Sequence, residues 1–228
     1  MDYIQNINKI KENVRRICLE YARDEKGITI VAAVKTQTSQ TVKDLAGALA
    51  DVGENRVQEF IEHYDAALPF RWHFIGRLQT NKVKYLIGKN VLIHSLDRED
   101  LANEINRLSV KNGIITECLA EVNMAKEETK GGVFPEDLPG FLKAAEKYKG
   151  IKVSGLMSVL PAISGGKTEE YYAALQKLFE EAKSRSYEKN IDIKYLSAGM
   201  SNDYNIAIKY GANIIRPGTV IFGERKYV

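Results

Sequence analysis

Short apolar, β-branched runs alternate with polar amphipathic stretches along the whole chain. Eight such runs are present, at 28–34, 50–52, 71–75, 91–95, 114–122, 151–159, 191–197 and 213–216. Strands that alternate with helices form parallel βαβ units, in which strands are buried on both faces. The number of runs favours a (β/α)8 TIM barrel over an open doubly wound sheet. No Gly-rich dinucleotide fingerprint follows the first run, where an open sheet would usually carry one.

One further helix is predicted ahead of the first strand, over residues 3–25. Its apolar face consists of Ile7, Ile10, Val14, Ile17 and Tyr21. The chain has 228 residues, and α/β barrels of this length usually have one core, so we expect a single domain covering 1–228.

The composition excludes several classes of partner. The net charge of +3 is small and the two signs are mixed along the chain, so we expect no nucleic-acid partner. No apolar run is long enough to span a bilayer, and no secretory signal is present, so we expect no membrane association. Cys18 and Cys118 are too few and too far apart for a disulfide framework or a zinc site, which favours a cytoplasmic location.

No metal site is expected, because the three histidines lack metal-like spacing with carboxylates or thiols. They are His63, His73 and His94, which we interpret as packed or surface residues. The stretch 77–84 is locally basic. It is either a solvated loop and helix start or a loop at the barrel mouth that attracts an anion.

Lys35 is the most informative side chain, because it directly follows the first strand. Active sites of α/β barrels lie at the C-terminal ends of the strands, so Lys35 is expected at the mouth of the barrel. A partly desolvated amine can attack an aldehyde and form a Schiff base, as lysines that hold pyridoxal 5'-phosphate (PLP) do. The alternative is a lysine that only pairs with a phosphate or carboxylate.

The ends of the seventh and eighth strands predict a phosphate site. Residues 197–203 combine hydroxyls, Gly199 and the start of a helix, and barrels often bind phosphate between these two loops. Alternatively, Ser201 or Asn202 is simply an N-cap. After the eighth strand, Gly218 and Thr219 suit a phosphate. Arg216 either binds the phosphate too or lies beside a ring nitrogen, where its charge would oppose ring protonation.

Taken together, ordered strings along the chain resemble the YggS/PROSC family of PLP homeostasis proteins, which share the barrel of alanine racemase. The strings are Val34-Lys35-Thr36, Gly53-Glu54-Asn55, Trp72-His73-Phe74-Ile75-Gly76, Gly155-Leu156-Met157, Gly199-Met200-Ser201 and Arg216 with Gly218-Thr219. The resemblance implies the N-terminal barrel of alanine racemase without the β-domain of the racemases.

The resemblance also implies a cofactor and its contacts. Lys35 would carry PLP, a form of vitamin B6, as a Schiff base, and Arg216 would lie near the pyridine nitrogen. The phosphate contacts would be Ser201, Gly218, Thr219 and backbone amides near Met200, and the ring contacts would be Asn55, Met157 and Ser197.

The function that the resemblance implies is intracellular PLP homeostasis, meaning buffering and delivery of the cofactor with effects on amino-acid and keto-acid balance. PLP-dependent apoenzymes are the expected recipients, a monomer is the expected state, and no robust catalysis is expected. Two alternatives stay open. One is a PLP-dependent amino-acid racemase or another slow PLP enzyme, and the other is a barrel lyase or isomerase in which Lys35 attacks a phosphorylated sugar.

Overall fold

Eight parallel strands close into a barrel in the computed structural model, which describes residues 2–127, 129–161 and 167–223. Each strand pairs with the next along the chain, and the eighth pairs with the first. The strands are β1 (Thr29–Ala33), β2 (Asp51–Glu54), β3 (Arg71–Phe74), β4 (Val91–Leu96), β5 (Thr116–Glu121), β6 (Ile151–Met157), β7 (Ile191–Ser197) and β8 (Ile214–Ile215). The predicted (β/α)8 barrel is therefore confirmed.

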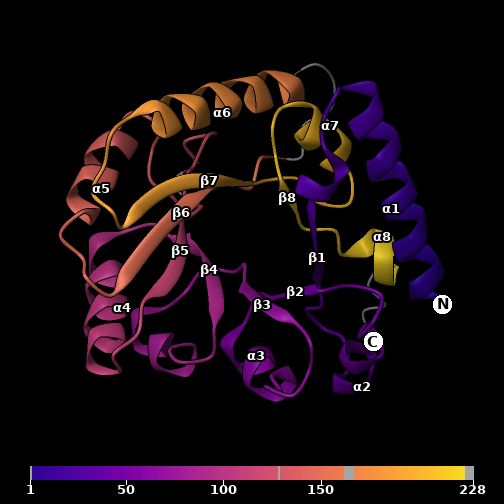
Figure 1. Ribbon diagram of the computed structural model, residues 1–228, viewed down its shortest axis with the longest axis horizontal. Helices are drawn as coiled ribbons and strands as arrows, with labels where there is room; N and C mark the ends of the chain where they lie inside the picture. Colours follow the sequence, from indigo (N-terminus) through magenta and orange to yellow (C-terminus); the bar gives the residue numbers. More distant parts are fainter. Residues whose placement is uncertain (1, 128, 162–166, 224–228) are drawn as a thin grey trace.

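Helices surround the strands (Figure 1). They are α1 (Tyr3–Glu20), α2 (Ser39–Asp44), α3 (Val57–His63), α4 (Glu99–Lys111), α5 (Leu138–Ala145), α6 (Lys167–Ser184), α7 (Tyr204–Lys209) and α8 (Thr219–Phe222). Two 3₁₀ turns add to them, η1 (Glu25–Gly27) and η2 (Thr80–Tyr85). Over the described ranges, no helix has both the length and the apolar character needed to cross a membrane.

Barrel closure depends on a very short last strand. Thr29 and Ile30 of β1 pair with Ile214 and Ile215 of β8, and β7 meets β8 only at Ser197. The N-terminal helix supports this weak seam from outside. Its Asn6 side chain donates to the carbonyl of Ile221 in α8 at 2.9 Å, and buried residues of α1 pack into the main core. Figure 1 shows α1 lying beside α7 and α8.

The predicted N-terminal helix is present but shorter than expected. It ends at Glu20, and Tyr21, which the sequence placed on the apolar face, is a C-cap residue with 39% of its surface exposed. Ala22 takes a left-handed conformation with φ of 51°, which terminates the helical path. Residues 21–25 were therefore wrongly assigned to the helix.

The second βα unit also differs from its predicted boundaries. Helix α2 begins at Ser39, because the Thr38 hydroxyl caps it by accepting from the Thr41 amide at 3.1 Å. It ends at Asp44, and Gly47 with φ of 86° turns the chain toward β2. Strand β2 extends through Gly53 and Glu54, beyond the predicted run 50–52, since parallel pairing with β3 continues to Glu54.

Two apolar layers enclose the strands. The larger lies between the barrel and its helices. The smaller fills the barrel interior and consists of Val31, Leu92, Leu119, Met157 and Ile214. Because successive side chains of a β-strand point to opposite faces, the same strand can contribute residues to both layers. The barrel is a packed core with its mouth at the C-terminal ends of the strands.

Candidate functional site

Lys35 lies at the mouth of the barrel, two residues beyond the end of β1, and its side chain is half-buried. A turn follows, closed by a hydrogen bond from the Gln37 amide to the Val34 carbonyl at 3.0 Å. Thr36 in this turn has φ of 66°, a left-handed conformation that is uncommon for a β-branched residue. The backbone directly after Lys35 is therefore held in an unfavourable conformation by its surroundings.

The loop after β8 packs against the end of β1. The Ala33 amide donates to the Pro217 carbonyl at 2.9 Å. A Cβ atom added at Gly218 would lie 3.4 Å from the Cβ of Ala33, so the missing side chain permits close contact between the loop and the strand. This contact places the 216–219 loop next to the strand that leads into Lys35.

Ser201 connects the loops after β7 and β8. Its hydroxyl oxygen accepts from the amide of Gly218 at 3.0 Å and from the amide of Val220 at 3.2 Å. Thr219 lies between these two residues, at the start of α8. Three residues predicted to contact a phosphate, Ser201, Gly218 and Thr219, therefore lie together.

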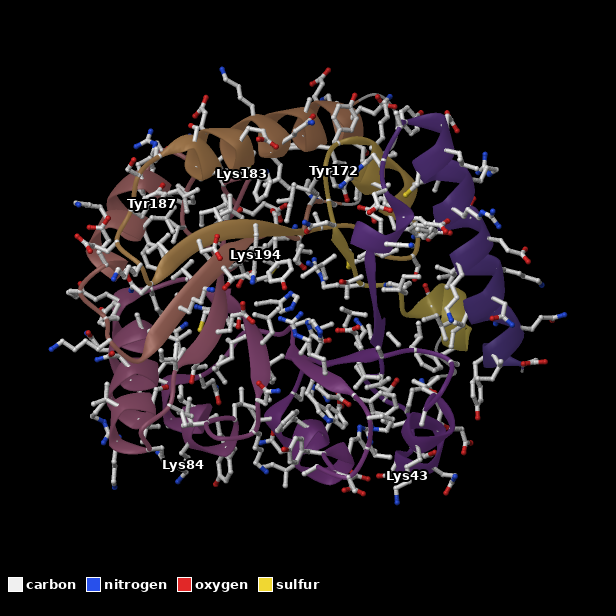
Figure 2. All side chains as sticks on the ribbon, viewed as in Figure 1. Lys43, Lys84, Tyr172, Lys183, Tyr187 and Lys194 are labelled. Atoms are coloured by element: carbon white, nitrogen blue, oxygen red, sulfur yellow. The ribbon has the colours of Figure 1, made fainter. Side chains whose placement is uncertain are left out.

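The Met200 amide already has a partner, because it donates to Oδ1 of Asp203 at 2.7 Å. Asp203 is the N-cap of α7, so the alternative that Ser201 or Asn202 is the N-cap is wrong. The other carboxylate oxygen of Asp203 accepts from the Tyr172 hydroxyl at 2.7 Å. Figure 2 shows Tyr172 pointing from α6 toward the barrel. The predicted role of amides near Met200 stays a prediction.

Arg216 follows β8 and is almost entirely buried. One terminal nitrogen, Nη1, donates a short hydrogen bond to the Ser197 hydroxyl, and Nη2 donates to the Ser158 carbonyl at 2.9 Å. Burial lowers the pKa of Arg216, while Tyr172 and Glu121 act in the opposite direction. A guanidinium with so high an intrinsic pKa keeps its charge, so the site contains a buried and directionally fixed cation.

Glu121, at the end of β5, is the acid that the sequence argument missed. Burial is the main cause that raises its pKa to about 7, and Asp97 adds to the increase while Arg216 opposes it. Within the described residues, its Oε2 atom is buried without a hydrogen-bond partner. Glu121 therefore titrates near neutrality close to Arg216. Its position at a strand end was the available signal, but β5 was predicted to continue through Val122.

Asn55 and Met157 lie at the ends of β2 and β6. The Oδ1 atom of Asn55 is buried, and none of the described residues donates to it. Met157 is 1% exposed and belongs to the apolar cluster inside the barrel. Asn55 thus offers a hydrogen-bond acceptor that no described residue uses, and Met157 offers an apolar surface beneath the mouth.

A cavity of about 830 Å³ lies beside these residues, lined in part by Asn55. Arg77 and Lys82 of the basic stretch contribute to its wall, together with Arg56 and Arg98. Lys84 of the same stretch lies instead near the ring of Tyr85. Two cations of the stretch therefore face a cavity at the mouth, as the anion-attracting alternative requires.

All three histidines are buried. His63 binds Glu54, whereas His73 and His94 lie inside the barrel and bind each other. Among the described residues, no group of three or more His, Cys, Asp or Glu side chains is arranged to hold a metal ion. The connection of His94 to Ser197, and through it to Arg216, had no signal in the sequence spacing.

Residues 5–226 match the family described as "Alanine racemase, N-terminal domain". The "Pyridoxal phosphate homeostasis protein" of Aquifex aeolicus is 42% identical over 231 residues, which cover 100% of both chains. A solved structure of "an unknown protein from Bifidobacterium adolescentis" superposes with a TM-score of 0.90 at 26% identity, covering 97% of this chain and 94% of that one.

PipY of Synechococcus elongatus, solved with PLP bound, has a TM-score of 0.78 at 26% identity. The match covers 92% of this chain and 99% of PipY. Sequence matches of full length and a shared closed barrel agree with the resemblance carried by the strings around Lys35 and Arg216. The chain therefore belongs to the alanine racemase N-terminal domain family and, within it, to the pyridoxal phosphate homeostasis proteins.

Proposed function

We propose that this chain binds PLP covalently through Lys35 and serves in PLP homeostasis by holding and releasing the cofactor. The observation that carries the proposal is the meeting of the β1 end, which leads into Lys35, with the β8 loop that bears Arg216 and Gly218. The name of the Aquifex aeolicus relative and the PLP bound to PipY support the same conclusion.

The residues present fit PLP. The unpartnered Oδ1 of Asn55 and the apolar Met157 suit a ring with polar substituents, and Ser197 lies at the same end of the barrel. The group between Ser201 and Thr219 suits the phosphate, helped in our proposal by Met200. Lys35 would hold PLP through its amine, and bound PLP would supply an aldehyde carbon for that nitrogen, with the carbonyl oxygen leaving as water.

Arg216 favours a carrier over a transaminase-like enzyme. A fixed cation beside the pyridine nitrogen disfavours protonation of that nitrogen, and an unprotonated ring withdraws electrons less strongly. The buried guanidinium, held by Ser197 and Ser158, suits this role. We propose that the chain acts as a single-domain cytoplasmic monomer, with PLP-dependent apoenzymes as recipients and no nucleic-acid or membrane partner.

The test is the visible absorption spectrum of the purified protein with added PLP, followed by borohydride reduction and peptide mapping. We expect a band that borohydride removes and a reduced adduct on Lys35. Lys35→Ala should abolish the adduct and leave the protein folded, because a mouth residue contributes little to the core. Lys84→Ala is the matched control, since Lys84 is a lysine of the basic stretch that lies near the ring of Tyr85 and is not among the residues that line the cavity.

A reducible adduct that persists in Lys35→Ala would overturn the assignment of the lysine. If the unmodified protein forms no adduct at all, the proposed function fails and the phosphorylated-sugar alternative becomes the leading one. Exchange of the α-proton of added alanine in deuterated water tests the racemase alternative on the same sample. Turnover of the α-proton at rates typical of enzymes would contradict a carrier role.

A further inference from the structure

A line of hydrogen-bonded polar side chains crosses the barrel interior from the mouth toward the opposite end. It starts at Arg216, whose Nη1 donates to Ser197. The Ser197 hydroxyl lies 2.9 Å from Nδ1 of His94, and Nε2 of His94 lies 2.8 Å from Nδ1 of His73. Nε2 of His73 lies 2.8 Å from Oδ1 of Asp51, the first residue of β2. We call these five residues the polar chain.

The two ends of the polar chain and the neutral form of its two imidazoles together determine the direction of every hydrogen bond in it. Arg216 can only donate and the Asp51 carboxylate can only accept. With both imidazoles neutral, Nδ1 of His73 accepts from Nε2–H of His94, and Nδ1 of His94 then accepts from the Ser197 hydroxyl. The Nε2–H group of His73 then donates to Asp51. This arrangement needs two neutral imidazoles, each with its proton on Nε2.

The surroundings favour the neutral form of both rings. Burial lowers the pKa of His73, and the positive charge of Arg71 lowers it further. Asp51 and Glu117 have the opposite effect but do not outweigh burial and Arg71. Burial also lowers the pKa of His94, and His73, Arg216 and Arg71 add to that effect. Because Arg216 does not release its proton, the polar chain is a line of fixed dipoles rather than a path for protons.

The guanidinium depends on this line for one of its two contacts. Ser158 provides a carbonyl whose position is fixed by the backbone, whereas the Ser197 hydroxyl can rotate. The acceptor at His94 directs the Ser197 proton away from Arg216 and leaves a lone pair facing the guanidinium. Each of the inner members, Ser197, His94 and His73, has a partner on both sides, as burial of polar groups requires.

We propose that His94 and His73 are positioning residues, which act through Ser197 to aim the Arg216 guanidinium at the ring nitrogen of PLP. The inference rests on the proposed function for the identity of the cofactor. The direction of the hydrogen bonds in the polar chain does not depend on the cofactor. The positioning role and the proposed function can therefore be tested separately.

The first measurement is nitrogen NMR of the histidine side chains in the protein without PLP. We expect Nε2 protonated and Nδ1 unprotonated in both His73 and His94. A proton on Nδ1 of His94 would overturn the proposed direction of the hydrogen bonds, whether or not the protein binds PLP.

The second measurement compares variants by PLP affinity and by the absorption band of the bound cofactor. His94→Leu interrupts the chain and should weaken PLP binding about tenfold and shift the band. His94→Gln should restore binding to within about twofold, because the amide oxygen can accept from Ser197 and the amide nitrogen can donate to His73. Ser197→Ala interrupts the same line with little change of volume, and it carries the test if His94→Leu does not fold.

His63→Leu is the control. It also removes a buried, hydrogen-bonded histidine, but this one binds Glu54 and has no place in the polar chain. We expect it to lower stability without shifting the band. If folded Ser197→Ala or His94→Leu forms the Lys35 adduct with unchanged affinity and band, the positioning role is wrong although the proposed function stands. If the unmodified protein forms no adduct, the proposed function itself fails.

Discussion

The barrel interior contains two regions with different kinds of packing. One is the apolar cluster of Val31, Leu92, Leu119, Met157 and Ile214. The other is the polar chain from Arg216 to Asp51. Both lie within the same barrel, but they come largely from different strands, and β4 contributes to both with Leu92 and His94. Figure 2 shows side chains, including many nitrogen and oxygen atoms, filling the space within the ring of strands.

The difference lies in how each region responds to loss of one member. Apolar contacts have no direction, so a smaller side chain costs stability in proportion to the cavity it leaves. A hydrogen-bonded line is directional, and loss of one member leaves the next without a partner. The apolar cluster should therefore determine how stable the barrel is, and the polar chain should determine how its cation is oriented.

Leu119→Ala should produce the largest loss of stability among the changes considered in this comparison. Leu119 is fully buried in the apolar cluster, and its truncation should lower the free energy of unfolding by about 3–4 kcal/mol. Urea unfolding measures the loss. Since Leu119 has no part in the polar chain, the absorption band of bound PLP should not move, and a shift as large as that of Ser197→Ala would contradict the division into two regions.

Glu121→Gln should make the protein less sensitive to pH. The folded pKa of Glu121 is about 7, above its ordinary value of 4.5, so its favourable contribution is complete below pH 4.5 and is lost as the pH rises through 7. Above pH 7 the variant should be more stable than the unmodified protein by at most about 3 kcal/mol. Below pH 4.5 this difference should disappear.

Unfolding curves at several pH values measure this difference. Glu54 also has a pKa raised to about 7, chiefly by burial, but it is present in both proteins and cancels in the comparison. A stability difference that stays constant with pH would show that Glu121 does not titrate in this window.

Asp51→Asn should have the smallest effect on stability, about 1 kcal/mol, because the amide oxygen still accepts from His73 and only the charge is lost. The matched control is Asp192→Asn, which removes a carboxylate from an exposed pair with Lys152 at 3.3 Å. That change should stay within about 0.5 kcal/mol. Equal effects of the two changes would mean that the charge at the end of the polar chain is unimportant.

The sequence predicted the barrel because strand periodicity and strand number are local properties. It also predicted that Lys35, Ser201 and Arg216 lie at one end, since parallel strands of a barrel share a mouth. The strand boundaries were not all predicted. The second run was expected to end at residue 52, yet Gly53 belongs to β2, where an added Cβ would lie 2.9 Å from Cγ1 of Val31.

The polar chain could not be predicted because its members come from different strands. His73, His94 and Ser197 lie on β3, β4 and β7, and their contact depends on how far each strand is displaced along the barrel. A one-residue change of register would turn a histidine outward. Nothing in the spacing of these residues along the chain records that displacement, so each histidine was interpreted alone.

Because β1 pairs with β8, the site combines a segment that is synthesised early with one that is synthesised late. Lys35 leaves the ribosome early, whereas Arg216 and Gly218 are among the last described residues to be synthesised. A growing chain therefore presents the reactive amine without the cation and without the bonds between Ser201 and the β8 loop. Only a barrel that has closed contains the whole proposed site, so the final strand controls when a nascent chain gains the complete set of its proposed cofactor contacts.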